Sequence, residues 1–321
     1  MSSNRAKRGV VSSVRSCSNV LQPEFPAPPS TSMREHKPIN AAAIAVVGCV
    51  RNGAKTVRRA VETLARATAG FANVQFLVVE SDSTDATLAE LAGLREQSDR
   101  FEFISLGALA ERIPARTERI AHCRNRYLEE LRGNARYSAV DYVMVADLDG
   151  VNADLRPEAL ATCWNTTIAW DVVTANQRDA YYDIWALRHP DWCPVDCHEQ
   201  YTRLREIFER PRALTIAIHS RMVRLSPMAA WIEVDSAFGG LAIYRREALL
   251  AGNYSGVEGG QSVCEHVPLH SQLRAQGFRI FINPALINAH RTDHSARIRL
   301  HVRWRREIEA FGKRLRERWR R

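Results

Sequence analysis

The stretch Tyr142-Val143-Met144-Val145-Ala146-Asp147-Leu148-Asp149-Gly150 decides the fold of this chain. Its first five residues form a short apolar run, which predicts a buried strand, and Gly150 opens a turn after it. Asp147 and Asp149 stand one residue apart where the strand ends, so we expect their carboxylates to converge on one point. Oxygen ligands of this kind suit Mg²⁺ or Mn²⁺, which in turn hold diphosphates. The competing interpretation is a solvated surface turn, which an Asp-x-Asp often is.

Similar apolar runs recur on the amino-terminal side of this stretch, and helical patterns separate them. We expect strands at 41–50, 74–79, 101–106 and 141–146, and helices around 57–64, 88–94 and 116–131. This alternation predicts an α/β fold with a mainly parallel central sheet and helices on both faces. Ligands of such sheets bind beyond the carboxyl ends of the strands. The polar residues that fall there are Asn52, Glu80, Asp82, Asp147 and Asp149.

Two common phosphate-binding loops are absent from the sequence. A dinucleotide-binding loop needs Gly-x-Gly-x-x-Gly after the first strand, where only Gly53 is present. A P-loop needs Gly-Lys-Ser/Thr, which the chain lacks. Phosphates are therefore expected to be held by a metal ion.

The composition is that of a globular protein, with 45% hydrophobic and 25% charged residues among 321. No apolar run approaches the ~20 residues that span a bilayer. The amino terminus has no apolar signal region, and seven scattered cysteines favour a reducing compartment. These features predict a cytoplasmic protein.

Four segments are expected along the chain. Residues 1–40 are rich in Ser, Pro and Arg and predict disorder, and either Met1 or Met33 is the start. Residues 41–150 form a nucleotide-binding half, and residues 151–296 form an acceptor-binding and catalytic half. Residues 297–321 predict a basic amphipathic helix.

That last segment carries most of the net charge of +9, because it holds ten Arg and one Lys against three Glu. Its apolar residues recur at three- and four-residue spacing. This pattern fits a helix on an anionic membrane surface at the inner leaflet, or a helix packed on the domain. Because the remaining chain is nearly neutral, no nucleic-acid partner is expected.

Several motifs between residues 41 and 292, taken in their order along the chain, resemble those of GT-A glycosyltransferases of family 2. Glu80-Ser81-Asp82-Ser83-Thr84-Asp85-Ala86-Thr87 is similar to the acidic segment after their second strand, although Ala86 replaces a favoured Gly. Arg124-Asn125 resembles their Ala-Arg-Asn helix, and Asp147-Leu148-Asp149 their Asp-x-Asp. Phe238-Gly239-Gly240 resembles their acceptor-side segment. The helix and Tyr182–Arg188 look closest to the fungal (cryptococcal) capsule-associated mannosyltransferases.

The resemblance implies a role for each candidate residue. Asp149 and His290 would bind Mn²⁺ or Mg²⁺, with His294 as the rival of His290. The donor would contact Asn52, Glu80, Asp82, Arg124 and Asp147. The acceptor would contact Trp185, Gly239, Gly240 and His266. Transfer with inversion also needs a base for the acceptor hydroxyl, for which Glu265 is the candidate. In a retaining mechanism, Glu265 would only bind the acceptor.

These expectations lead to one function and two alternatives. The chain would be a metal-dependent glycosyltransferase that moves a hexose from a GDP- or UDP-sugar to a glycan or lipid-linked acceptor, in surface polysaccharide synthesis. The alternatives are a nucleotidyltransferase and a non-catalytic protein that recruits partners through its basic tail.

Overall fold

The computed structural model describes residues 35–292, so the predictions for residues 1–34, His294 and the tail 297–321 lie outside this range. Within it, order begins before residue 41. The His36 ring stacks on Trp170 with centroids 4.3 Å apart, and Lys37 Nζ lies 2.7 Å from Asp141 Oδ2. These two side chains therefore contact the domain ahead of the first strand.

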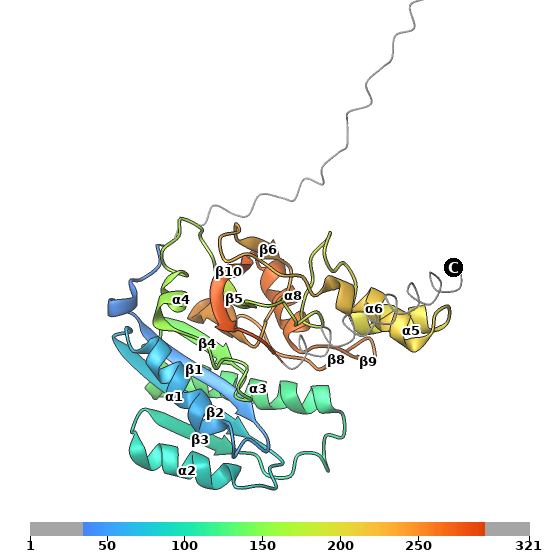
Figure 1. Cartoon of the computed structure of the whole chain (residues 1–321). Helices are drawn as coiled ribbons and strands as arrows, with labels where there is room; N and C mark the ends of the chain where they lie inside the picture. Colours follow the sequence, from blue (N-terminus) through green and yellow to red (C-terminus); the bar gives the residue numbers. More distant parts are fainter. Residues whose placement is uncertain (1–34, 293–321) are drawn as a thin grey trace, which may run out of the picture. The chain divides into compact units, whose positions relative to one another are not determined.

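One central sheet organises the described residues, in the spatial order β3-β2-β1-β4-β7-β5-β10-β6 (Figure 1). Its strands are β1 (Ala43–Val50), β2 (Asn73–Glu80), β3 (Phe101–Ser105), β4 (Tyr142–Ala146), β5 (Val172–Gln177), β6 (Ile232–Val234), β7 (Leu241–Arg245) and β10 (Ile280–Ala289). A separate ribbon pairs β8 (Val257–Glu258) with β9 (Gln261–Ser262).

The strand directions confirm the prediction of a mainly parallel sheet. The first four strands pair in parallel, and β5 pairs in parallel with β10. β7 runs antiparallel between β4 and β5, and β6 runs antiparallel to β10 at the edge. The sequence pattern did not indicate the insertion of β7, which joins the two halves of the chain into one sheet.

Helices cover both faces of this sheet, as predicted. They are α1 (Val57–Thr68), α2 (Thr87–Gln97), α3 (Arg116–Gly133), α4 (Pro157–Ala161), α5 (Cys197–Arg205), α6 (Arg210–Ala217), α7 (Arg246–Leu250) and α8 (His266–Ala275). Ile44 and Val46 of β1 pack in one core with α1, α2 and α4, whereas Ala45 and Val47 pack in the opposite core with α3, α7 and α8. This alternation explains why the strand reads as one continuous apolar run.

A glycine lets β1 pass close to the motif that follows β4. A Cβ atom on Gly48 would lie 2.5 Å from the carbonyl oxygen of Ala146 and 3.1 Å from Leu148 Cδ1. Any larger residue would push the backbone of β4 or the Leu148 side chain aside. Gly48 therefore helps to set the position of the Asp147-Leu148-Asp149 loop.

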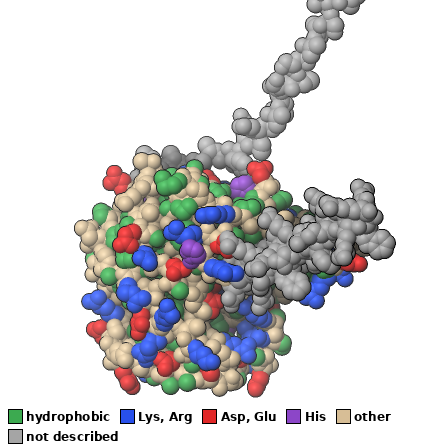
Figure 2. Space-filling view, in the orientation of Figure 1, with side chains coloured by type: hydrophobic (Ala, Val, Ile, Leu, Met, Phe, Trp, Pro, Cys, Tyr) green, Lys and Arg blue, Asp and Glu red, His purple; other side chains and the backbone are tan. Residues whose placement is uncertain are grey.

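The surface of the described part mixes all side-chain types. On the face seen in Figure 2, acidic and basic side chains alternate, and hydrophobic side chains are scattered between them. Among residues 35–292, no helix is both long and apolar enough to span a membrane.

Candidate functional site

The Asp147-Leu148-Asp149 loop begins where β4 ends, at the carboxyl edge of the sheet. Leu148 is buried at 3% exposure and anchors the loop, while Asp149 is exposed. The backbone N–H of Asp147 donates to the carbonyl oxygen of Gly240 at 3.0 Å, and Val151 N–H donates to Asp149 Oδ1 at 3.0 Å. These bonds fix the backbone of the motif and present both carboxylates at the edge.

Arg124 of α3 bridges two predicted site residues. Its Nε donates to Glu265 Oε1 at 2.8 Å, and one terminal nitrogen donates to Asp147 Oδ1 at 3.3 Å. The guanidinium is 4% exposed and lies 5.2 Å from the centroid of the Phe238 ring. We call Arg124, Asp147, Glu265 and the neighbouring Asp183 the Arg124 cluster.

Burial dominates the electrostatics of Asp147. It raises the pKa of this carboxyl to about 7; Arg124 opposes the shift, and Asp149, Asp183 and Glu265 add to it. The side chain still keeps 34% of its surface exposed, so a ligand can reach it. Crowded carboxylates of this kind are stabilised when a cation joins them.

Asp183 was missed by the sequence reasoning as a site residue. Its Oδ2 accepts a hydrogen bond from the backbone N–H of Gly239 at 3.0 Å, and its charge acts on Asp147. No apolar run pointed to it, because the preceding strand β5 reads Val-Val-Thr-Ala-Asn-Gln and was not predicted.

Three buried amides connect the loops around this edge, and we call Asn152, Gln177 and Asn288 the amide triad. They are 2%, 0% and 0% exposed. Asn288 Nδ2 donates to Asn152 Oδ1 at 2.8 Å, and Gln177 Nε2 donates to Asn288 Oδ1 at 3.0 Å. Asn152 Nδ2 in turn donates to the carbonyl oxygens of Asp147 at 2.9 Å and Gly240 at 3.0 Å. The triad therefore joins the ends of β4, β5 and β10.

The Gly239-Gly240 turn needs both glycines. Their φ angles are +69° and +82°, which side chains rarely adopt. A Cβ on Gly239 would also lie 2.8 Å from the carbonyl oxygen of Ala175, and one on Gly240 would lie 2.6 Å from Val151 Cγ1. The acceptor contact predicted for this turn stays a prediction, since its tight packing alone accounts for the two residues.

The residues predicted to hold the nucleoside gather after β1 and β2. Asn52 Oδ1 accepts from Thr84 N–H at 2.8 Å, and Glu80 Oε1 accepts from Ser83 N–H at 2.9 Å. Both side chains thus brace the loop after β2. Glu80 is 1% exposed, so its carboxylate primarily stabilises this loop.

Asp82 has a left-handed backbone, with φ +57°. Its Oδ1 accepts from Ala110 N–H at 2.8 Å, and its Oδ2 lies 3.8 Å from Arg119 Nε. Burial alone would raise the pKa of Asp82, but the Ala110 hydrogen bond and the nearby arginines lower it below its usual value. Through Arg119 and Arg124, α3 contacts both this group and the Arg124 cluster.

His266 and Trp185, which were predicted to bind the acceptor, have different surroundings. His266 is 1% exposed, its ring stacks on Phe238 at 3.8 Å, and neither ring nitrogen has a hydrogen-bond partner among the described residues. Burial, with Arg124 and His270 adding, lowers the pKa of His266 well below its usual value. Trp185 packs edge-on against His198 at 4.8 Å.

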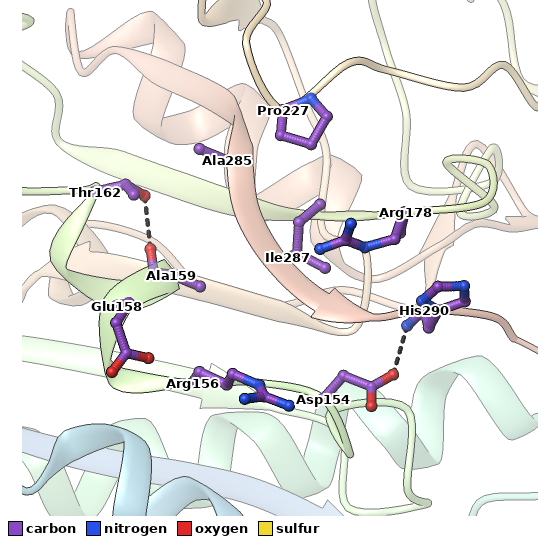
Figure 3. A pocket seen from close by; sticks show the side chains of 10 residues that line it. All are labelled: Asp154, Arg156, Glu158, Ala159, Thr162, Arg178, Pro227, Ala285, Ile287 and His290. Carbon is purple, nitrogen blue, oxygen red and sulfur yellow. Dashed lines mark hydrogen bonds between the residues drawn. The ribbon is translucent and has the colours of Figure 1, made fainter.

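His290 faces a different space from Arg124. Its backbone N–H donates to Asp154 Oδ2 at 2.6 Å, and the residue lines a pocket with Arg156 and Arg178 (Figure 3). No hydrogen bond or ion pair joins its ring to Asp149 within the described range. Among residues 35–292, no three His, Cys, Asp or Glu side chains are grouped to hold a metal ion by themselves.

A comparison with known protein families gives a match over most of the described residues. The family described as glycosyl transferase family 2 matches residues 45–249. A search of curated protein sequences found no match.

Several solved structures are similar at low identity. The mannosyltransferase PcManGT from Pyrobaculum calidifontis, in complex with GDP-Man and Mn²⁺, is 16% identical with a TM-score of 0.42, over 79% of this chain and 60% of its own. Glucosyl-3-phosphoglycerate synthase from Mycobacterium tuberculosis, in complex with UDP, is 15% identical with a TM-score of 0.41. The match covers 78% of this chain and 72% of the synthase. Residues 1–349 of S. aureus TarS, in complex with UDP-GlcNAc, are 14% identical with a TM-score of 0.44, over 79% and 60%.

The chain thus spans less than two thirds of the lengths of PcManGT and of the TarS fragment. The family match, in contrast, covers more than half of the 321 residues and includes the sheet through β7 together with the Asp-x-Asp loop. On that match, the chain belongs to glycosyl transferase family 2, and its α/β architecture is the GT-A fold.

Proposed function

We propose that this chain transfers a hexose from a nucleotide-sugar donor to a glycan or lipid-linked acceptor, with a divalent metal ion at the Asp-x-Asp loop. The observation that carries the proposal is the Arg124 cluster at the end of β4. Arg124 contacts the carboxylates of Asp147 and Glu265 there, and the charges of Asp149, Asp183 and Glu265 act on Asp147, whose pKa is raised to about 7. The excess negative charge fits a site that is completed by a cation and its diphosphate.

The residues present fit Mg²⁺ or Mn²⁺. Ions of this type commonly use one or two carboxylates and fill their remaining positions with water and substrate phosphates, so a three-residue cage is not required. Asp149 and Asp147 would hold the ion, and His290 stays a predicted ligand. When bound, the metal would neutralise the charge that develops on the leaving diphosphate.

Arg124 is proposed to act mainly by orienting carboxylates. Its guanidinium is already shared between Glu265 and Asp147, so it holds both acids in place beside the Asp-x-Asp loop. At the other end of α3, Asn52 and Asp82 are proposed to border the nucleoside.

Proton removal from the acceptor hydroxyl is assigned to Glu265, with Asp183 as the second candidate. Glu265 lies beside Arg124 and is 6% exposed, whereas Asp183 neighbours Asp147 and is partly exposed. The His266 ring lies 3.6 Å from Glu265 Oε1, its buried nitrogen atoms have no hydrogen-bond partner among the described residues, and an acceptor contact there stays a prediction. Glu265→Gln and Asp183→Asn separate the two assignments, since loss of the base lowers kcat about 10²–10⁴-fold.

Mannose is proposed as the first sugar to test, because of the resemblance to the fungal capsule-associated mannosyltransferases. We also propose that the chain acts in surface polysaccharide synthesis on the cytoplasmic side of the membrane, with the tail 297–321 on the inner leaflet. Sedimentation of a 1–296 truncation with anionic vesicles tests the tail, and unchanged sedimentation would count against it.

The experiment that tests the donor site is a thermal-shift panel of UDP, GDP, CMP and their sugars, with and without Mn²⁺. The proposal expects one nucleoside diphosphate to stabilise the wild type only with metal, and Asp149→Ala to abolish this shift. Asp191→Ala removes an exposed carboxylate elsewhere and serves as the matched control.

If no nucleotide raises the melting temperature of the wild type, the proposal is wrong and a non-catalytic binding protein is favoured. Release of pyrophosphate from a nucleoside triphosphate and a sugar phosphate would indicate a nucleotidyltransferase instead.

A further inference from the structure

A pocket opens beside His290, at the end of β10. Its volume is about 420 Å³, and we call it the Arg178 pocket. The wall includes Arg156, Arg178, His290, Asp154, Ile287 and Pro227. Arg178 and His290 directly follow β5 and β10, and Asp154 lies five residues after Asp149. The pocket therefore shares the carboxyl edge of the sheet with the proposed donor site.

The two arginines of this pocket are unpaired. Neither guanidinium forms a salt bridge or hydrogen bond with another described residue, although most arginines near the site do. Figure 3 shows Arg156 approaching from the segment before α4 and Arg178 from the end of β5, with the pocket between them. Free guanidinium forks are suited to the paired oxygens of a phosphate or carboxylate.

The acidic residues of the pocket do not cancel this preference. Asp154 Oδ2 is engaged by the backbone N–H of His290 at 2.6 Å. Glu158 lies at the far end from His290 and Arg178 in Figure 3. The floor is apolar at Ile287, Ala285 and Pro227, which gives the carbon body of a ligand a surface to rest on.

We propose that the Arg178 pocket binds the phosphate or carboxylate group of an anionic acceptor, with Arg156 and Arg178 as the binding residues. The assignment to the acceptor rests on the proposed function. It follows from position. Asn152 of the amide triad is hydrogen-bonded to Asp147 and to Asn288, and Asn288 lies two residues before His290. A group held beside His290 thus lies next to the loop that would hold the donor.

The test measures binding of inorganic phosphate and glycerol 3-phosphate to the full chain by calorimetry, in EDTA so that no metal contributes. We expect Arg156→Gln/Arg178→Gln to weaken binding at least tenfold. Arg59→Gln/Arg66→Gln removes two exposed arginines of α1 and the same charge, and should change binding less than twofold. Equal weakening in both variants, or no binding by the wild type, would overturn the proposal.

A second arm distinguishes the sources of the anion. Binding of glycerol 3-phosphate indicates a free phosphorylated acceptor, whereas retention only on phosphatidylglycerol vesicles, lost in the same double variant, indicates a lipid headgroup. Binding must also persist when Mn²⁺ and the nucleotide chosen by the thermal-shift panel are present. Displacement of phosphate by that nucleotide would show a shared donor site and overturn the acceptor assignment.

Failure of the proposed function has a different signature. If no nucleotide raises the melting temperature of the wild type but phosphate binding still requires both arginines, the anion site is supported. The assignment of this edge to a transferase site is then wrong.

Discussion

Arg124 and Arg178 lie near the same edge of the sheet and are used in opposite ways. Arg124 is 4% exposed and shared between two carboxylates, whereas Arg178 is exposed and unpaired. A buried charge must be paired in the folded state, so the Arg124 cluster is assembled before any ligand arrives. An exposed charge keeps its hydration until a ligand replaces it. If the two proposals hold, the reacting centre is rigid before ligands arrive and the neighbouring anion site is open to solvent.

The largest expected effect comes from breaking the buried ion pair. Arg124→Met leaves Glu265 buried without its partner and should lower the free energy of unfolding by about 3–5 kcal/mol. Urea denaturation measures this loss. Arg124→Met/Glu265→Met should recover part of it, because no unpaired charge remains. A single variant as stable as the wild type would mean that the cluster is not held by this pair.

Removing charge from the loop should separate stability from activity. Asp147→Asn relieves the crowding that raises the pKa of Asp147, so the free energy of unfolding at pH 7 should stay the same or rise. Sugar transfer should fall about 10²–10³-fold, as for the loss of one preorganised electrostatic contact. Release of the nucleoside diphosphate measures the rate. Retained transfer would remove Asp147 from the proposed site.

The amide triad offers a matched pair of variants on one strand. Asn288 and Asn283 are both 0% exposed, and both lie on β10. Replacing either with Ala leaves buried polar partners unsatisfied and should cost about 1–3 kcal/mol in unfolding free energy. Asn288→Ala should also weaken metal-dependent nucleotide binding about tenfold, because Asn152 then loses its support. Asn283→Ala, which disturbs Thr162 instead, should not. Equal binding by the two variants would confine the triad to a structural role.

Buried histidines should make the fold sensitive to acid. Burial lowers the pKa of His270 to about 3, while the unfolded chain has the ordinary value of 6.5. Between these values the unfolded state binds one more proton, so stability falls as the pH falls, by about 1.4 kcal/mol per pH unit. His270→Asn should reduce the slope of unfolding free energy against pH between 6 and 4. Ser236→Ala removes the hydrogen bond at 2.9 Å from His270 Nδ1 but keeps the ring, so the slope should remain.

The smallest expected effect lies in the Arg178 pocket. Arg178→Gln removes an exposed, unpaired side chain and should change the free energy of unfolding by less than about 0.5 kcal/mol. Urea denaturation of Arg178→Gln and of Arg124→Met, measured side by side, compares the two regions. A loss of 2 kcal/mol or more would reveal a structural role for Arg178 and remove that contrast.

The sequence predicted the part of this molecule that depends on local pattern. The apolar runs identified β1, β2, β3 and β4 to within one or two residues, and their carboxyl ends supplied the Asp-x-Asp loop. Their order in the sheet, β3-β2-β1-β4, was not predicted. Composition and spacing therefore sufficed for the strands of the first half of the sheet, but not for their order.

The remaining features depend on partners that lie far apart in the chain. Glu265 meets Arg124 across 141 residues, and Asn288 meets Asn152 across 136. No period or motif marks such pairs, so the sequence suggested a base at Glu265 without its ion pair and overlooked the amide triad and Asp183. The antiparallel β7 was missed for the same reason, since its neighbours β4 and β5 precede it by about 70 to 100 residues.

Helix α3 also fixes a length. Arg119 contacts Asp82 and Arg124 contacts Asp147, so five residues of one rigid helix separate the two contacts, about 7.5 Å along its axis. One inserted residue between them would turn everything that follows by about 100° and break one contact or the other. Under the proposed function, donors of different size would therefore be accommodated by the loops around α3, because the helix holds a constant distance between its two contacts.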